Sequence, residues 1–432
     1  MNAWLTIALT VTSLQTPNTP RPEDAAAPEL VVAEFAKHAR ALPAAWPAVL
    51  ELVQDARVIA IDVPRGVAQE TIALRAELTR RAIGERGVRS LALDADWTEV
   101  IRLDEYLRTG AGEPRALVAS MSPGPWCTRE FLELLVWMRL YNEDSAHAEK
   151  LSIFGLDVAD TRFSAMQVAG YFQKVDSASG DRMALVFAPL RQVDSFGRSR
   201  YFELSEPERD GLLAQIGEAI AMVEGSREEF VAKSSDVEWE LALRAAHALM
   251  RAEEIYRGML EGTLENRRAR AMAQNLAEHL ERTRARTLVW THDERAGSES
   301  GDSLGDLVRA VHGEKCVLLG ATFGRGVAWI PAGHETPAGA RALPQAPDGS
   351  VEHAFQRIEK PEVFLSLRAL PRDGSARSWL AQTHAMRGGD PRFVVEKEGF
   401  VPVEPARSYD GLFFLEVVTA PVFLEAEVVT PR

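Results

Sequence analysis

The chain alternates short apolar runs with longer stretches in which apolar residues recur at helical spacing. Four of the runs each end in an ionisable residue: residues 58–61 precede Asp62, 91–93 precede Asp94, 153–156 precede Asp157 and 288–291 precede His292. Such runs, separated by amphipathic segments of helical length, predict buried strands of a largely parallel sheet flanked by helices. The carboxyl ends of these strands share one rim, where α/β proteins place their sites. The pattern therefore predicts an α/β fold, and the ionisable groups at its rim favour an enzyme.

The same spacing predicts the helices and the order of the parts. We expect helices over 30–54, over 68–86 ending before Gly87, and over about 128–142 with Thr128 as the N-cap. From about 160 to 285 the strand pattern disappears while helical spacing continues, which predicts a helical insertion. The sheet resumes at 287–291 and 316–319, residues 297–302 form a polar loop beside the site, residues 331–350 form an irregular excursion, and 413–418 read as a late strand.

We therefore expect four parts: 1–29, a candidate signal peptide with a disordered linker; 30–160, the first part of an α/β core; 161–285, the helical insertion; and 286–432, the second part of the core with a C-terminal segment. Residues 4–11 have the length of the apolar core of a signal peptide, but no Lys or Arg precedes them. Export and a cytoplasmic location both stay open. No stretch reaches the roughly 20 apolar residues that a membrane span needs.

Composition narrows the classes of partner and chemistry. The net charge of −14 argues against a nucleic-acid partner, since phosphate binding requires clustered Lys and Arg. Cys127 and Cys316 form no CxxC motif, so no zinc site is implied; two buried thiols or a single bridge both remain open. The motif H-E-x-x-H is absent, and we expect neither a cofactor nor a metal ion. The glycines of 320–326 are interpreted as a turn after a strand, and the sequence does not indicate an oligomeric state.

Local motifs from about residue 30 to 425 suggest a family. They are, in chain order, Arg75; Leu93-Asp94-Ala95-Asp96-Trp97; Pro125-Trp126 with Thr128 and Glu130; Trp137-Met138-Arg139 with Tyr141-Asn142; Gly155 with Asp157; Arg270 with Met272-Ala273 and Asn275; Trp290 with His292; Phe323-Gly324-Arg325-Gly326; Met386-Arg387; and Tyr409-Asp410. In this order and spacing the chain resembles the erythromycin esterase family. The resemblance implies a sheet core with helical additions and hydrolysis of the macrolactone ester of macrolide antibiotics, as in the characterised members.

The chain departs from the family where the chemistry is expected. The first strand of the family leads into G-E-x-T-H-G, whose His is taken as the general base and whose Glu helps to orient it. Here the base position is Gly66 and the acid position Val63, or, with the stretch slipped by one residue, Arg65 and Asp62. The second family glutamate matches Asp94. The family's H-N-x-H appears as His292-Asp293-Glu294-Arg295, so one imidazole becomes a guanidinium.

These substitutions change the expected chemistry. Arginine stays protonated below about pH 12 and cannot replace an imidazole base, whose loss typically costs roughly 10²–10⁴-fold in rate. We therefore expect His292 to act as the base, oriented by Asp94 or Asp62, with Arg75 or Arg295 stabilising the oxyanion. Residues proposed to line the substrate cleft are Asp62, Arg65, Asp157, Trp126 and His384. The arginines and acids of this rim could instead neutralise one another, without a ligand.

Two classes of function stay open. The first is a hydrolase of an ester, similar to a macrolide lactone, in a bulky apolar small-molecule substrate. The second is a catalytically silent relative that keeps the fold and acts as a binding or structural protein. Macrolide resistance does not follow from the sequence. A distance of about 2.6–3.2 Å between His292 and Asp94 or Asp62 is the geometric condition for a working base.

Overall fold

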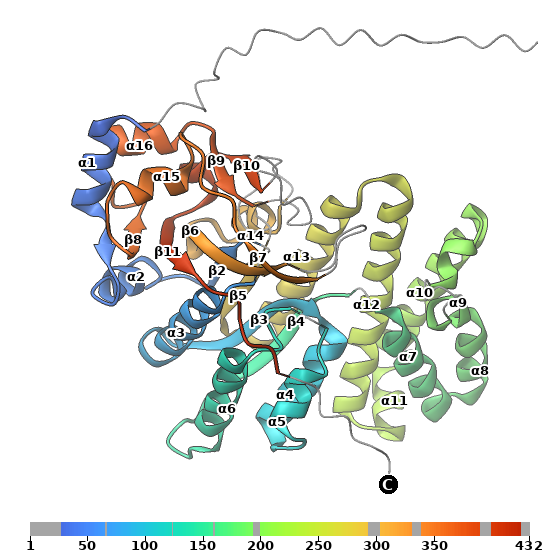
Figure 1. Ribbon diagram of the computed structural model, residues 1–432. Coiled ribbons are helices and arrows are strands. Elements are labelled where there is room, and N and C mark those ends of the chain that lie inside the picture. Colours follow the sequence, from blue (N-terminus) through green and yellow to red (C-terminus); the bar gives the residue numbers. More distant parts are fainter. Residues whose placement is uncertain are drawn as a thin grey trace, which may run out of the picture.

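The computed structural model describes residues 27–64, 67–122, 124–158, 160–192, 199–292, 303–330, 338–388 and 399–424 (Figure 1). The candidate signal peptide, most of the expected linker and the polar loop at 297–302 lie outside these residues. None of the helices in the described ranges is long and apolar enough to cross a membrane.

A mostly parallel sheet forms the centre of the fold, as the apolar runs predict. Its strands in the described residues are β1 (Arg40–Ala41), β2 (Val58–Val63), β3 (Val88–Asp96), β4 (Ser152–Asp157), β5 (Arg286–His292), β6 (Cys316–Ile330), β7 (Gly339–Ala342), β8 (Glu362–Ser366) and β11 (Gly411–Val418). They lie in the order β1-β8-β11-β6-β2-β5-β3-β4, with β7 on β6. The neighbours from β11 to β4 are parallel, and β1, β7 and β8 pair antiparallel. The predicted α/β class is confirmed.

Helices cover both faces of this sheet, because its central strands are apolar on both sides. On one face, α3 (Gln69–Arg86) and α6 (Arg129–Glu143) pack on side chains such as Ile59, Leu91 and Trp290. On the other, α13 (Leu264–Thr283) and α14 (Leu304–His312) pack on Val58, Ala92 and their neighbours. The central strands β2, β3 and β5 therefore contribute alternate residues to two separate cores, which holds their carboxyl ends in a fixed position.

Two predicted helix ends are confirmed in detail. Thr128 caps α6, because its hydroxyl accepts a hydrogen bond from the amide of Phe131 at 3.4 Å. Gly87 follows α3 with φ of +66°, the left-handed conformation that glycine adopts without steric cost.

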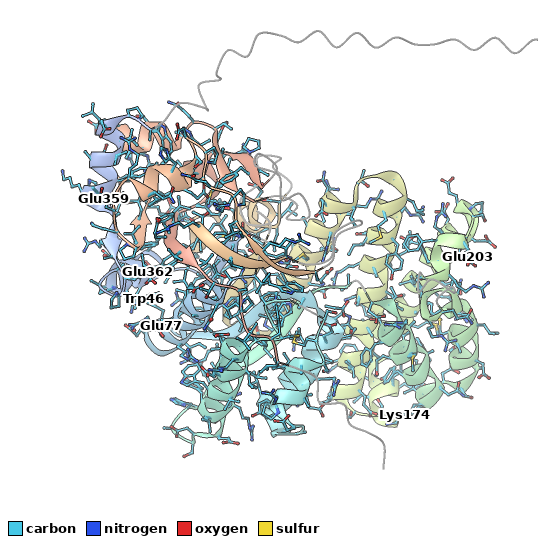
Figure 2. The ribbon with its side chains drawn as sticks, viewed as in Figure 1. Trp46, Glu77, Lys174, Glu203, Glu359 and Glu362 are labelled. Carbon is cyan, nitrogen blue, oxygen red and sulfur yellow. The ribbon has the colours of Figure 1, made fainter. Side chains whose placement is uncertain are left out.

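Helices α2 (Trp46–Leu52) and α3 meet at one edge of the molecule, where Figure 2 labels Trp46 and Glu77. Arg81 of α3 lies over the ring of Trp46 and also binds Glu77 at 2.6 Å.

Between β4 and β5 the chain forms helices, as the loss of the strand pattern predicts. They are α7 (Thr161–Val175), α8 (Ser177–Val186), α9 (Ala188–Arg191), the 3-10 turn Arg200–Glu203, α10 (Glu206–Gly225), α11 (Arg227–Lys233), α12 (Asp236–Glu261) and α13. The helices from α7 to α12 share an apolar core of their own and gather on one side of the sheet (Figure 1). Helix α13 returns the chain to β5 and packs on both this core and the sheet.

Three expectations about secondary structure were wrong. Residues 30–54 form α1 (Glu29–His38), β1 and α2 rather than one helix, because Pro43 has no amide hydrogen to donate within a helix. The glycines of 320–326 do not form a turn but lie within β6, where a Cβ on Gly326 would meet the backbone oxygen of Val418 at 1.9 Å. The expected excursion at 331–350 contains β7, while 331–337 lie outside the described residues.

Several short elements had not been predicted. They are α4 (Trp97–Thr109), α5 (Pro114–Ala119), α15 (Val351–Gln356), α16 (Ser375–Leu380), α17 (Pro405–Ser408), the 3-10 turn Gly313–Lys315, and the two-stranded sheet of β9 (His384–Arg387) and β10 (Phe400–Val403). Cys127 and Cys316 are both buried free thiols, so the structure contains no bridge between them.

Candidate active site

A cavity of about 360 Å³ opens where β2, β3, β4 and β5 end. Its wall includes charged groups from three of these strands and from three helices. The lining residues are Val63, Pro64, Val67, Thr71, Arg75, Asp94, Ala95, Asp96, Glu99, Ser122, Gly124, Pro125, Trp126, Asp157, Arg268, His292 and Trp329. The cavity therefore lies at the carboxyl rim of the sheet, where the strand pattern places a site.

His292 and Asp94 face one another at this cavity. Nδ1 of His292 lies 2.8 Å from Oδ2 of Asp94, so the pair meets the geometric condition set by the sequence. The Asp94 side chain is fully buried, whereas 21% of the His292 side chain is exposed. A carboxylate beside Nδ1 favours a proton on that nitrogen, which makes Nε2 the nitrogen through which the ring can act as a base.

Arg75 projects from α3 onto the end of β5. Its guanidinium is fully buried and donates a hydrogen bond to the carbonyl oxygen of Thr291, next to His292. Burial lowers the pKa of Arg75 to about 10, and the carboxylates of Asp62 and Asp94 oppose part of this effect. The guanidinium therefore stays charged at neutral pH, between two acids from strands on either side of β5.

Asp62 lies at the same strand end, but it is not among the residues that line the cavity. Its carboxylate accepts hydrogen bonds from the hydroxyl of Thr291 at 3.0 Å and from the hydroxyl of Tyr409 at 3.1 Å. On β2, Asp62 is paired with Thr291 and the next residue, Val63, with His292, so Asp62 and Val63 lie on opposite faces of the strand. Val63 and His292 both line the cavity.

Asp157 ends β4 and forms an ion pair with Arg268, a residue of α13 that the sequence analysis did not single out. Burial would lower the pKa of Arg268, but the neighbouring carboxylates of Asp157 and Asp94 outweigh burial and raise it. The sequence contains a signal for this position. Arg268 and Met272 are one helical turn apart and so lie on the same face of α13, and Met272 packs on the sheet. Arg268 is thus the second guanidinium at this rim.

Asp96, part of the family-like motif at 93–97, also lines the cavity. It caps α4 and accepts hydrogen bonds from the amide of Thr98 at 2.8 Å and the amide of Asp160 at 2.7 Å. Burial raises the pKa of Asp96 to about 6, the charge of Asp157 adds to this effect, and the hydrogen bonds oppose it. The cavity therefore contains a carboxyl group that titrates close to neutral pH.

Aromatic side chains form the apolar part of the wall. Trp126 lines the cavity and stacks on Trp290 with ring centroids 6.3 Å apart. Trp329 of β6 lies on the wall as well, and its backbone forms a bridge with Val67. These side chains give the cavity apolar surface beside its charged groups, a combination that is common in ligand sites.

The remaining predicted site residues are not placed in this cavity. His384 lies on β9, is 3% exposed, stacks on Trp379, and donates a hydrogen bond from Nε2 to the Trp379 carbonyl oxygen at 2.7 Å. It is absent from the described cavity wall. Arg65 and Arg295 lie outside the described residues. Within the described ranges, no group of three or more His, Cys, Asp or Glu side chains is arranged to hold a metal ion.

This arrangement has the parts needed to activate water. An imidazole oriented by a carboxylate can accept a proton from water, and a nearby guanidinium can stabilise an oxyanion that forms when water attacks a carbonyl group. The structure brings together five of the predicted residues, Arg75, Asp94, Trp126, Asp157 and His292, with Asp62 directly behind them.

Comparisons with known proteins concern the family and the fold. A family model described as erythromycin esterase matches residues 83–418. Among solved structures, a Bacillus cereus protein has a TM-score of 0.77 at 19% identity, covering 91% of this chain and 98% of its own. A protein described as a succinoglycan biosynthesis protein has a TM-score of 0.75 at 18% identity, with the same coverage of 91% and 98%. A histidine-to-asparagine mutant of the erythromycin esterase EreC, in its open conformation, has a TM-score of 0.64 at 15% identity, covering 89% and 95%. At these identities the structural likeness concerns the fold alone.

Proposed function

The chain belongs to the erythromycin esterase family, and we propose that it hydrolyses an ester bond, with His292 as the base that activates water. The observation that carries this proposal is the 2.8 Å distance between His292 Nδ1 and Asp94 Oδ2 at the wall of the cavity. This pairing supplies an oriented imidazole from the end of another strand in place of the family's histidine, whose position is Gly66 or Arg65 here.

In the proposed reaction, water attacks the ester carbonyl while Nε2 of His292 accepts its proton. The carbonyl oxygen becomes an oxyanion, which the positive charges of Arg268 and Arg75 stabilise. The tetrahedral intermediate then collapses, the bond to the alcohol oxygen breaks, and His292 returns its proton to the leaving alkoxide. Asp94 stays ionised and stabilises the imidazolium.

The walls of the cavity favour an ester with a bulky apolar part. Trp126, Trp329 and Val67 can cover such a group, while the charged residues lie toward the strand ends. A macrolide lactone is one member of this substrate class. The esterase described among the structural neighbours makes macrolides the first compounds to test.

A second function is favoured by the ion pairs at the same rim. Arg268 is bound to Asp157, and Arg75 lies close to Asp62 and Asp94, so much of the charge is already neutralised without a ligand. A chain that binds a family-type ligand but no longer turns it over would keep this network. Thermal stabilisation by a macrolide or an ester, without any hydrolysis, would identify that second function.

The experiment that separates these functions compares hydrolysis by the wild type and by His292→Ala. The assay uses p-nitrophenyl esters of increasing chain length and a panel of macrolides. We expect the variant to lose roughly 10²–10⁴-fold in kcat/KM. The matched control is His353→Ala, because Nε2 of His353 also lies near an aspartate, 3.6 Å from Oδ1 of Asp348, but away from the described cavity wall. A wild type that is active and a His292→Ala variant that is equally active would overturn the proposal.

A further inference from the structure

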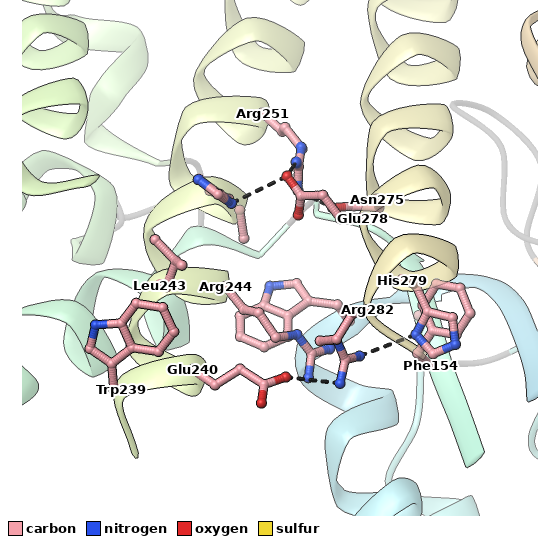
Figure 3. A pocket seen from close by; sticks show the side chains of 14 residues that line it. Phe154, Trp239, Glu240, Leu243, Arg244, Arg251, Asn275, Glu278, His279 and Arg282 are labelled. Atoms are coloured by element: carbon pink, nitrogen blue, oxygen red, sulfur yellow. Dashed lines mark hydrogen bonds and ion pairs between the residues drawn. The ribbon is translucent and has the colours of Figure 1, made fainter. Parts of the chain in front are cut away.

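A second cavity of about 360 Å³ lies between the helices α12 and α13, the edge strand β4 and the start of α4. Figure 3 shows it from close by. None of the described residues that line it also lines the candidate active site. The wall combines aromatic rings with a group of basic side chains that the proposed hydrolysis does not use.

Most charged groups in this second cavity are already paired. Arg282 binds Glu240 at 2.8 Å, and Arg251 forms an ion pair with Glu278 (Figure 3). Nδ1 of His247 lies 3.2 Å from the Glu278 carboxylate. These pairs leave each of the two glutamates with a cationic partner, so neither acid is left to neutralise a further cation.

His279 adds no charge to the cavity. Its Nδ1 accepts a hydrogen bond from Arg282 at 3.2 Å, and its Nε2 lies 2.8 Å from the Ser90 hydroxyl, to which it can donate. Burial lowers the pKa of His279 well below its ordinary value, and the charges of Arg282 and Arg244 add to this effect. The ring is therefore neutral at physiological pH.

Arg244 is the basic residue whose charge is not matched. Its guanidinium lies over the ring of Trp97, 5.5 Å from the centroid, and among the described residues it forms neither an ion pair nor a hydrogen bond. Burial lowers the pKa of Arg244, as does the charge of Arg282, while the charges of Asp104, Glu240 and Glu278 oppose them. A partly buried cation of this kind gains from an anionic partner more than an exposed one does, because its water shell is incomplete.

Apolar surface lies directly beside this cation. Trp97, Trp239, Phe154 and Leu243 contribute to the wall, and the last three are labelled in Figure 3. A guanidinium next to flat aromatic rings recognises a planar acid group attached to an apolar body, since the fork of donors matches a carboxylate. The volume is within the range of small-molecule sites, roughly 300–1,000 Å³.

We propose that this cavity binds a small organic monocarboxylate with a flat apolar body, its carboxylate on Arg244 and its body against the aromatic wall. A monoanion fits better than a phosphate ester, because one positive charge is left unmatched, and a second negative charge would face Glu240 and Glu278. The purely structural alternative is that Arg244 only braces Trp97 through a cation–π contact.

Titration calorimetry with 2-naphthoate tests the proposal, with the neutral 2-naphthamide and the dianionic 1-naphthyl phosphate as comparison ligands. We expect the wild type to bind 2-naphthoate more tightly than either. Arg244→Gln should weaken naphthoate binding by about 10- to 100-fold and leave naphthamide binding unchanged. Arg182→Gln is the matched control, because Arg182 is exposed on α8 and paired with Glu218 at 2.8 Å.

Further variants locate the ligand and check the fold. Binding of 2-naphthoate should be unchanged in His292→Ala; a loss there would place the ligand in the candidate active site and overturn the proposal. The melting temperature of Arg244→Gln should not fall, since the variant removes an unmatched charge. Equal affinities for naphthoate and naphthamide, tighter binding of the phosphate, or an unchanged affinity in Arg244→Gln would each overturn the assignment.

Discussion

Asp96 should make the stability of this protein fall as the pH rises toward neutrality. Its side chain is partly buried at the wall of the candidate active site, and burial raises its pKa from 3.8 to about 6. Between these two values the folded state binds more protons than the unfolded state. The stabilisation from the protonated form is therefore complete below about pH 4 and lost above about pH 6.

The size of the effect follows from the two pKa values. Each pKa unit corresponds to about 1.4 kcal/mol. The rise to about 6 then amounts to ~3 kcal/mol as an upper limit. Because Asp96 is partly exposed, solvent screening should reduce this to about 1–2 kcal/mol. The substitution Asp96→Asn removes the titration while an oxygen acceptor remains for one of the two amides that the carboxylate binds.

Urea unfolding at pH 4.0 and pH 7.5 measures the effect, and both values lie away from the pI near 5.3. The quantity to compare is the free energy of unfolding of Asp96→Asn minus that of the wild type at each pH. The part of the lost hydrogen bonding that does not depend on ionisation cancels, and the part that does is already contained in the raised pKa. We expect this difference to be about 1–2 kcal/mol more positive at pH 7.5 than at pH 4.0, which means that the variant gains stability relative to the wild type.

Asp160→Asn is the matched control, because Asp160 lies beside Asp96 and its pKa is shifted the other way. Burial raises the pKa of Asp160, but its hydrogen bonds and ion pair with Arg162 outweigh burial and lower it. Its stabilisation is present above about pH 4 and lost below, so the control should not gain stability at pH 7.5. A difference for Asp96→Asn that is constant within about 0.5 kcal/mol between the two pH values would refute the reasoning.

Three further predictions concern the core, a helix end and the first strand. Arg75→Met should destabilise the protein by about 3–5 kcal/mol in urea unfolding, because it leaves buried carboxylates without their cation; a loss below 1 kcal/mol would contradict this. Thr128→Ala should cost about 1 kcal/mol in the same assay by removing the cap of α6, whereas Thr128→Ser should cost less. The double variant Val63→Glu, Gly66→His should hydrolyse esters faster than the wild type.

The strands and their rim could be predicted because buried parallel strands appear in the sequence as unbroken apolar runs. The run before His292 and the run before Asp94 end side by side once β5 and β3 pair, which brings the imidazole and the carboxylate together. The shared edge follows from parallel pairing alone, because every parallel strand ends at the same edge, whereas the neighbourhood of β5 and β3 is a tertiary property.

The rest of the site depends on packing that a single sequence does not reveal. Asp62 ends its strand as Asp94 does, yet its carboxylate binds Thr291 and Tyr409 and is absent from the described cavity wall. Arg268 reaches the rim from a helix more than a hundred residues after Asp157, with which it forms an ion pair. His384 belongs to a family-like segment, but it is absent from the described cavity wall, and its ring is buried against Trp379. Side-chain direction at these positions is a tertiary property.

The double variant tests whether the end of the first strand still faces the reacting groups. Val63 lines the cavity and is paired with His292, so a glutamate at this position would lie beside the imidazole on the neighbouring strand. Gly66, the aligned base position, lies outside the described residues, and its replacement follows from the family's motif. With an imidazole and a carboxylate at the family's own positions, in addition to His292, we expect a rise in kcat/KM of about 10²-fold or more. The control Val63→Gln, Gly66→Asn has similar side-chain volumes without an acid or a base and should show no gain. If the glutamate and histidine variant folds and is no faster than this control, the first strand no longer supplies catalytic groups in this chain.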